Sequence, residues 1–264
     1  MPIAATKGKE IFDDVNRLLS EIRSYLPDTD IRVRRLLSEA DKLIRADAAE
    51  GYSAKAAVYQ LTGNLNEVLK HANNSVSLTS EPVVLANKCA YLLNLGAFSA
   101  AQEAYGIAMH PRKGQFLEKF HFGYACGAFQ TMTHFLEEAA RIQLDIKHLD
   151  ALTALQGNNL LMRNGMSEDR VAAFLDVAGE VLREQRMMFV DHPRVFVANT
   201  TTDSILSFVI LLPVDADRAE QLDTDLQCRF LERFPEFPYF LSIAFESGLP
   251  SNERYSDRPA ELSA

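Results

Sequence analysis

Two pairs of an acidic residue and a histidine are the first candidates for metal chemistry in this chain. Glu118 precedes His121 by three residues and Asp145 precedes His148 by the same spacing, which places each pair on one face of a helix. Two such pairs on facing helices can bind two iron ions when further inward carboxylates complete the site. Here each motif contains a lysine, and no isolated glutamate lies on an otherwise apolar helix face. We therefore expect surface ion pairs, with no metal and no cofactor.

Other histidines offer candidates for acid–base catalysis. His134 has two glutamates one turn further along, which is the spacing of an ion pair on a helix surface. Asp191 and His192 precede Pro193, where the sequence pattern changes, and a local hydrogen bond in a turn is the simpler interpretation. The sequence contains no GxSxG, HExxH, P-loop or GxGxxG motif. We predict no catalytic residues, and an enzyme site at the seam near Asp191 and His192 remains an alternative hypothesis.

Charge and cysteine content limit the class of partner. The chain has 27 Lys and Arg against 36 Asp and Glu, a net charge of −9 at pH 7. Nucleic acids and anionic membranes are bound by clustered basic side chains, so neither is an expected partner. The three cysteines are far apart and have no CxxC spacing, which argues against a disulfide framework and a zinc site. With no recognisable signal peptide, we expect a cytoplasmic protein with buried free thiols, Cys126 among them.

The elements that position these residues are predicted to be helices over residues 1–191. Ile11, Val15, Leu18 and Ile22 follow the spacing of one apolar helix face. Short breaks separate this helix from the next ones. Further helices are predicted over residues 49–62, 65–78, 82–95, 99–109, 115–130, 133–148, 149–163 and 167–188, with breaks that include Gly63, Gly96 and Gly165.

The pattern changes after residue 192 to a small α+β unit, predicted over residues 192–247. Residues 194–200 and 205–212 are predicted strands of a hairpin, residues 215–234 a helix and residues 239–245 a third strand. The strands 205–212 and 239–245 are apolar on both faces, whereas one helix can cover only one face of a sheet. The second face is therefore expected to meet the helices, a second copy in a homodimer or another partner. Residues 248–264 are expected to form a mobile tail.

Two of the helix pairs share a repeated pattern. Tyr52, Ala56, Tyr59 and the turn residue Gly63 match Leu85, Cys89, Leu92 and Gly96, with the turn glycines 33 residues apart. On the following helix Ala101 and Ala108 take positions where a small side chain lets two helices approach closely. Gly127 is a candidate small packing residue in a third pair, and Gly165 a candidate turn in a fourth.

This pattern resembles the tetratricopeptide repeat family. The resemblance implies an α-α superhelix over residues 1–191, whose first helices line a concave face that binds a protein or peptide. Asn87 lies where that family often carries an asparagine facing the groove. The group of basic residues with which some members bind the C-terminal carboxylate of a partner is not evident in this sequence. Six polar residues are the predicted partner-binding residues on this face: Ser53, Gln60, Asn87, Asn94, Lys119 and Gln130.

We therefore predict a mainly α fold, a tetratricopeptide-like superhelix followed by a small α+β unit in the order strand, strand, helix, strand. The predicted function is a non-catalytic adaptor or scaffold that binds a protein partner, as a monomer or as a homodimer through the α+β unit. An alternative is an acidic antitoxin or immunity-type protein that neutralises a basic enzyme. That alternative would use the net charge of −9 and the aspartates of residues 215–225.

Overall fold

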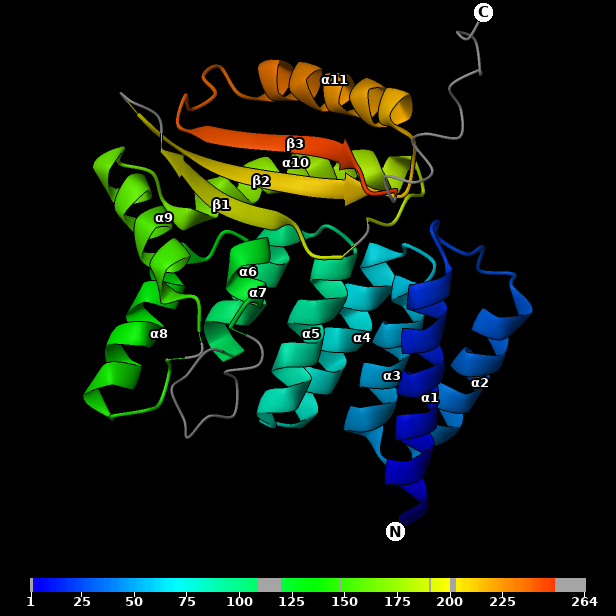
Figure 1. Ribbon diagram of the computed structural model, residues 1–264. Coiled ribbons are helices and arrows are strands. Elements are labelled where there is room, and N and C mark those ends of the chain that lie inside the picture. The colour runs from blue at the N-terminus through cyan, green and yellow to red at the C-terminus, as the bar shows by residue number, and fades with distance from the viewer. Residues whose placement is uncertain (1, 109–119, 148, 190, 200–202, 250–264) are drawn as a thin grey trace, which may run out of the picture.

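The computed structural model describes residues 2–108, 120–147, 149–189, 191–199 and 203–249. Within these ranges the protein is an array of helices on which a three-stranded sheet with one further helix is seated (Figure 1). The predicted fold class, mainly α followed by a small α+β unit, is confirmed. The helices of the array are α1 Pro2–Glu21, α2 Ile31–Ala46, α3 Ala48–Gln60, α4 Leu65–Leu78, α5 Pro82–Asn94, α6 Phe98–Ala108, α7 Phe122–Ala125, α8 Phe129–Arg141, α9 Ala151–Arg163 and α10 Glu168–Glu184.

Local sequence explains where many of these helices begin and end. Asp47, Asn64 and Asp150 each cap a helix, because their side chains accept a hydrogen bond from a backbone N–H in the first turn. Gly63, Gly96, Gly127 and Gly165 all have positive φ, between 62° and 74°, and each ends the turn between two helices. The predicted turns at Gly63, Gly96 and Gly165 are confirmed.

The third pair of helices differs from the prediction. Gly127 is a turn residue and not a small packing residue within a helix. The helix predicted over residues 115–130 is represented by the short α7, since Gly127 breaks it, and residues 115–119 lie outside the described residues. The helix predicted over residues 133–148 is α8, which ends at Arg141, because Gln143 adopts a left-handed conformation with φ 55°.

The helix α10 does not extend the stack but lies across the turns of the earlier pairs. A Cβ atom on Gly127 would stand 2.7 Å from Val171 of α10, and one on Gly179 would stand 1.8 Å from the carbonyl oxygen of Gly96. Val171 and Gly179 are eight residues apart, about 12 Å along the axis of α10. The helix therefore contacts the turn at Gly127 near its start and the turn at Gly96 about 12 Å further along. Beyond its C-terminus, the Tyr25 backbone N–H donates to the carbonyl of Arg186.

Charged side chains of α10 also cap the ends of the helices it crosses. The carboxylate of Glu168 accepts hydrogen bonds from the first backbone N–H groups of α8. Asp176 accepts from the Ser99 backbone N–H at the start of α6, and Arg183 donates to the Leu95 carbonyl at the end of α5, at 2.7 Å. Anions at helix N-termini and cations at C-termini are favoured by the helix dipole, so α10 stabilises three helices that precede it.

The C-terminal unit has the predicted order of elements, with β1 Arg194–Asn199, β2 Ser204–Leu212, α11 Ala216–Arg233 and β3 Leu241–Ser247. The sheet order is β1-β2-β3, antiparallel between β1 and β2 and parallel between β2 and β3. One face of β2 carries Leu206, Phe208 and Ile210, all fully buried, and the ring of Phe208 meets that of Phe129 at the start of α8. The helix α11 lies beside β3 and also packs on α10, where Phe174 contacts Phe230.

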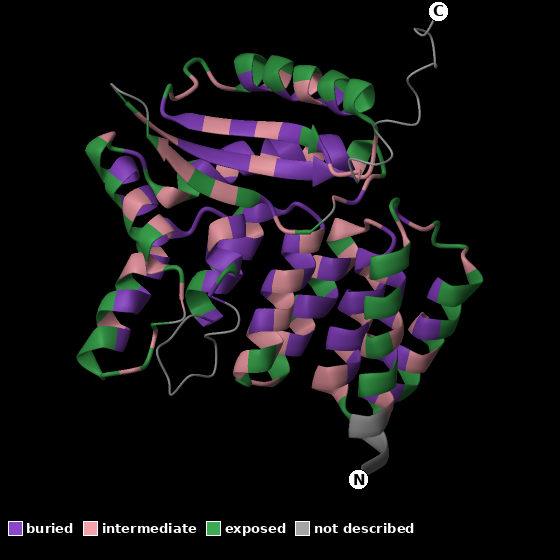
Figure 2. Ribbon diagram, in the orientation of Figure 1, coloured by how far each residue is buried: buried purple, intermediate pink, exposed green. Residues whose placement is uncertain are grey.

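The other face of the sheet is only partly covered, as Figure 2 shows. Phe196 is 45% exposed, and Ile205 and Val209 are half-buried. The prediction that residues 239–245 are buried on both faces is wrong, because burial alternates along β3 and Ser242 and Ala244 are half-buried. A single hydrophobic cluster nevertheless includes residues on both sides of the predicted boundary at residue 191.

Candidate functional site

Two of the predicted groove residues are structural. Ser53 and Gln60 on α3 were expected to be exposed, but their residual exposures are only 3% and 2%. The Ser53 hydroxyl lies 3.1 Å from the hydroxyl of Tyr91, and the Asn94 side-chain amide donates to Gln60 Oε1 at 3.0 Å. Both contacts join α3 to α5. Since these side chains fill the space between neighbouring first helices, they cannot face a partner, and this part of the prediction is wrong.

The other four predicted residues are not brought together. Asn87 and Asn94 are half-buried on one face of α5, two turns apart. Gln130 is exposed at the start of α8, where its backbone N–H donates to Glu168. Lys119 lies outside the described residues.

A pocket at the seam between the helices and the sheet unit contains Asn94. It has a volume of about 240 Å³ and is lined by Leu19 of α1, Asn94 of α5 and the segment after α10, namely Met188, Phe189, Asp191 and His192. Apolar side chains and three polar groups therefore converge on one opening. We refer to it as the seam pocket.

Backbone geometry fixes the polar end of the seam pocket. Asp191 has a left-handed conformation with φ 63°, and its carboxylate accepts the His192 backbone N–H at 2.8 Å. The ring of His192 lies 5.3 Å from that of His121 and 5.5 Å from that of Phe122, centroid to centroid. The predicted local hydrogen bond is confirmed, and it lies in a bend of the chain. Among the residues that the structure describes, no group of three or more metal-binding side chains occurs.

A buried histidine lies on the α3–α4 hairpin, away from the seam pocket. The ring of His71 is stacked between those of Tyr52 and Tyr59, with centroid distances of 5.8 and 5.5 Å. Its Nε2 atom lies 3.1 Å from a carboxylate oxygen of Glu67. Burial lowers the pKa of His71, and the positive charge of Lys55 adds to this effect, while Glu67 opposes it. The imidazole is thus held neutral, as a packing element of this hairpin.

Two of the three cysteines have the character expected of packing residues, whereas the third is not buried as predicted. Cys89 and Cys126 are buried free thiols, and Cys228 is exposed. Burial raises the pKa of Cys89 to about 12 and that of Cys126 well above its ordinary value. Because the thiolate is the nucleophile, neither buried thiol is suited to covalent catalysis.

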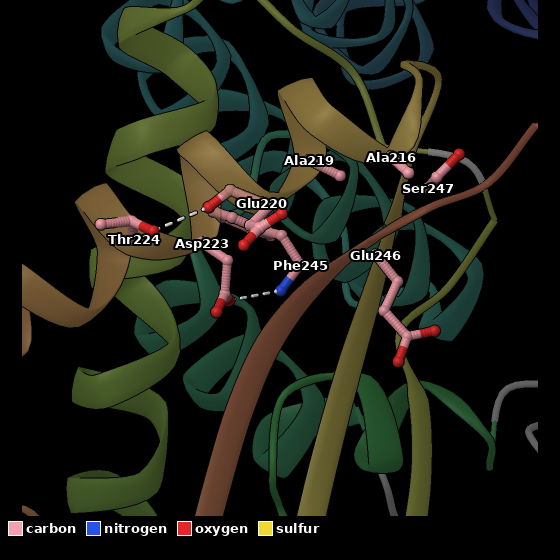
Figure 3. A pocket seen from close by; sticks show the side chains of 8 residues that line it. All are labelled: Ala216, Ala219, Glu220, Asp223, Thr224, Phe245, Glu246 and Ser247. Carbon is pink, nitrogen blue, oxygen red and sulfur yellow. Dashed lines mark hydrogen bonds between the residues drawn. The ribbon is translucent and has the colours of Figure 1, made fainter.

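A second hollow lies between α11 and the end of β3, and its chemistry is acidic (Figure 3). It has a volume of about 470 Å³, and its lining includes Glu220, Asp223 and Glu246. Asp223 accepts the backbone N–H of Phe245 at 2.9 Å, so this carboxylate fixes α11 against the strand. The other two carboxylates are exposed to solvent.

Sequence patterns indicated only part of the seam pocket. The sequence placed Asn94 in the expected groove and Asp191 and His192 at the seam, whereas it gave Leu19 and Met188 only as residues of predicted helices and indicated nothing for Phe189. Their convergence depends on backbone hydrogen bonds between residues 23–25 and 186–188, which no local pattern encodes. Comparisons with protein-family models, curated proteins and solved structures found no match to this chain. No helix in the described part of the chain combines the length and apolar character needed to cross a membrane.

Proposed function

We propose that this chain is a non-catalytic protein-binding scaffold, tetratricopeptide-like in its array, that holds an extended segment of a cytoplasmic partner along α5 as far as the seam pocket. The observation that carries this proposal is the shared face of Asn87 and Asn94. They lie about 10 Å apart along the helix axis, which an extended peptide spans with about three residues. The Asn87 amide can both donate to and accept from a peptide backbone, and Asn94, whose amide nitrogen donates to Gln60, can accept through its carbonyl oxygen.

The seam pocket supports the same proposal at one end of this face. Its apolar lining suits one apolar partner side chain, and Asp191 suits a donor or a positive charge beside it. Among the described residues, no hydrogen bond engages the side chain of Asn87, so its amide is available to a ligand. The net charge of −9 favours a partner segment that carries basic residues.

Affinity capture with a matched pair of variants tests the proposal. Asn87→Arg places a bulky cation on the α5 face, whereas Asn66→Arg places it on an exposed position of α4. We expect a partner identified by mass spectrometry to be retained by the Asn66→Arg protein and lost by the Asn87→Arg protein. Equal retention by both variants would contradict binding along α5.

The acidic hollow favours a second candidate function, the neutralisation of a basic enzyme. Glu220 and Glu246 present exposed carboxylates there, beside a helix that also carries Asp217. Under this alternative, Glu220→Lys with Glu246→Lys should abolish capture of the partner, while Asn87→Arg should not. A third candidate, an enzyme with its site in the seam pocket, predicts that His192→Ala abolishes an activity without altering the melting temperature.

A further inference from the structure

A pocket separate from the seam pocket lies where three distant parts of the chain meet. It has a volume of about 580 Å³ and is lined by the loop between α1 and α2, by the turn between α3 and α4, and by the segment that follows α10. Its polar groups include those of Tyr25, Asp28, Thr62, Asn64 and Arg186. We refer to it as the Tyr25 pocket. Its volume lies within the range of sites for small molecules, about 300–1,000 Å³.

The side chain of Tyr25 brings an unused hydroxyl to this pocket. Tyr25 is only 5% exposed, and its ring packs on the α3–α4 turn, where a Cβ atom on Gly63 would stand 2.6 Å from it. Within the described parts of the chain the hydroxyl forms no hydrogen bond, and it is not sealed from solvent, so it opens into the pocket that Tyr25 lines. Polar groups of side chains buried to this extent normally have a partner. A ligand in the pocket provides one.

A guanidinium is fixed beside this hydroxyl. The Nη2 atom of Arg186 donates to the carbonyls of Tyr25 and Leu26, both at 3.1 Å, while its Nη1 and Nε atoms have no acceptor among the described residues. Burial raises the pKa of Tyr25 to about 12, and the positive charges of Arg183 and Arg186 oppose this rise. The phenol therefore stays protonated at neutral pH, close enough to a cation to feel its charge. A hydroxyl donor next to a guanidinium suits a carboxylate.

The pocket also contains a negative charge that nothing neutralises. Asp28 is exposed on the α1–α2 loop, and its carboxylate has no hydrogen-bond or ion-pair partner in the described part of the chain. Asp28 and Arg186 line the same pocket without pairing with each other. The Thr62 hydroxyl donates to the carbonyl of Tyr59 and keeps a lone pair that can accept. Two opposite charges that are not spent on each other suit a ligand that carries both.

We propose that the Tyr25 pocket binds a small zwitterion of the amino-acid class. The carboxylate of the ligand accepts hydrogen bonds from the Tyr25 hydroxyl and from Arg186, and its ammonium group donates to Asp28 and Thr62. The amide nitrogen of Asn64 is a further donor, because only the oxygen of that side chain is used to cap α4. This site is distinct from the face of α5 and from the seam pocket, so the proposal is independent of the proposed function.

The ligand should bind only the folded chain. Tyr25 and Arg186 are 161 residues apart in the sequence, and the fold alone brings them together. A ligand that binds the folded state raises the melting temperature in proportion to the logarithm of its concentration, once that concentration exceeds the dissociation constant. A thermal shift that depends on ligand concentration is therefore expected.

Isothermal titration calorimetry of the full chain with each of the common free amino acids tests the proposal. We expect at least one of them to bind with a dissociation constant on the order of 1 mM or below. Its N-acetyl and C-amide derivatives each lack one of the two charges, so each should bind at least tenfold more weakly. If no free amino acid binds, or if the derivatives bind as tightly as the parent amino acid, the proposal is wrong.

Two matched pairs of variants test whether binding occurs in this pocket. Tyr25→Phe removes only the hydroxyl and should weaken binding about tenfold, whereas Tyr52→Phe on α3 should not. Asp28→Asn should abolish the preference for the free amino acid over its N-acetyl form, whereas Asp13→Asn, at an exposed position of α1, should leave it unchanged.

Melting without ligand separates a loss of binding from a loss of folding. Tyr25→Phe and Asp28→Asn should melt like the wild type, because each removes a group that has no partner in the described structure. If Tyr25→Phe binds as tightly as the wild type, or if Asp28→Asn keeps the full preference, the assignment to the Tyr25 pocket is overturned.

Discussion

Replacing Gly179 by alanine tests the contact between α10 and the α5–α6 turn. The added Cβ atom would stand 1.8 Å from the carbonyl oxygen of Gly96 and 2.6 Å from its carbonyl carbon. Both are backbone atoms, so no side chain can rotate away, and the two segments must separate by about 1.5 Å to reach ordinary contact distance. That movement also stretches the hydrogen bonds from Arg183 to the carbonyls of Leu95 and Gly96, now 2.7 and 2.9 Å long.

The cost is the sum of overpacking, about 1–3 kcal/mol, and of weakened hydrogen bonds from a charged donor, about 1.5–3 kcal/mol. We expect Gly179→Ala to lower the free energy of unfolding by about 4 kcal/mol. For a chain of 264 residues, an unfolding entropy of about 2.1 cal/mol/K per residue converts this into a fall of about 7 °C in Tm.

Chemical and thermal denaturation measure this effect against a matched control. Gly106 on α6 has no atom within 4 Å of an added Cβ, so Gly106→Ala should stabilise the protein by about 0.5 kcal/mol. If Gly179→Ala unfolds like the wild type, the close approach of α10 to the turn is absent and the reasoning fails.

Three further predictions concern packing, pH and domain independence. Phe174→Ala should lower the free energy of unfolding by about 3–5 kcal/mol, because the fully buried ring of Phe174 contacts Phe230 and other phenylalanine rings of the C-terminal unit. Urea denaturation measures this change. The pKa of His71 in the folded protein lies below its ordinary 6.5. As the pH falls through 6.5, this histidine therefore binds a proton more readily in the unfolded chain than in the folded protein, and the free energy of unfolding decreases. The wild type should therefore lose more stability than His71→Gln between about pH 7.5 and 5.5, and equal losses would contradict this. A fragment ending at Asp191 should aggregate at concentrations where the whole chain stays in solution, because the partners of Phe174 are removed; a fragment that melts like the whole chain would refute this.

Local patterns predicted most of the elements and their order, although the third helix pair was predicted wrongly. Apolar spacing and glycine turns predicted α3 to α6 within one or two residues of their observed ends, and the change at Pro193 predicted the sheet unit. These features depend on interactions between residues close in the chain. The prediction that Ser53 and Gln60 are exposed groove residues was wrong for a different reason. Their burial depends on contacts with α5, which lies about 35 residues away in the sequence.

The path of α10 was the largest feature missed, although the sequence carries a trace of it. Helices α6 and α8 begin after Ala97 and Ala128, which are poor capping residues. Helices without a local cap have backbone N–H groups that need acceptors from elsewhere. Asp176 and Glu168 provide them from α10, so a missing cap indicated a long-range partner without identifying it.

The contact between residues 23–26 and 186–188 has a consequence for the order of events in folding. The Arg186 guanidinium donates to the carbonyl of Tyr25, 161 residues earlier in the chain. An open array of repeats can form progressively from its first unit, because each repeat contacts only its neighbours. Here the first turns acquire their last contacts only after α10 has been made, on the order of 10 s later at ordinary rates of synthesis. Closing so long a loop also raises the contact order, which slows folding. The first helices therefore remain incompletely buried until α10 and the segment after it have been synthesised.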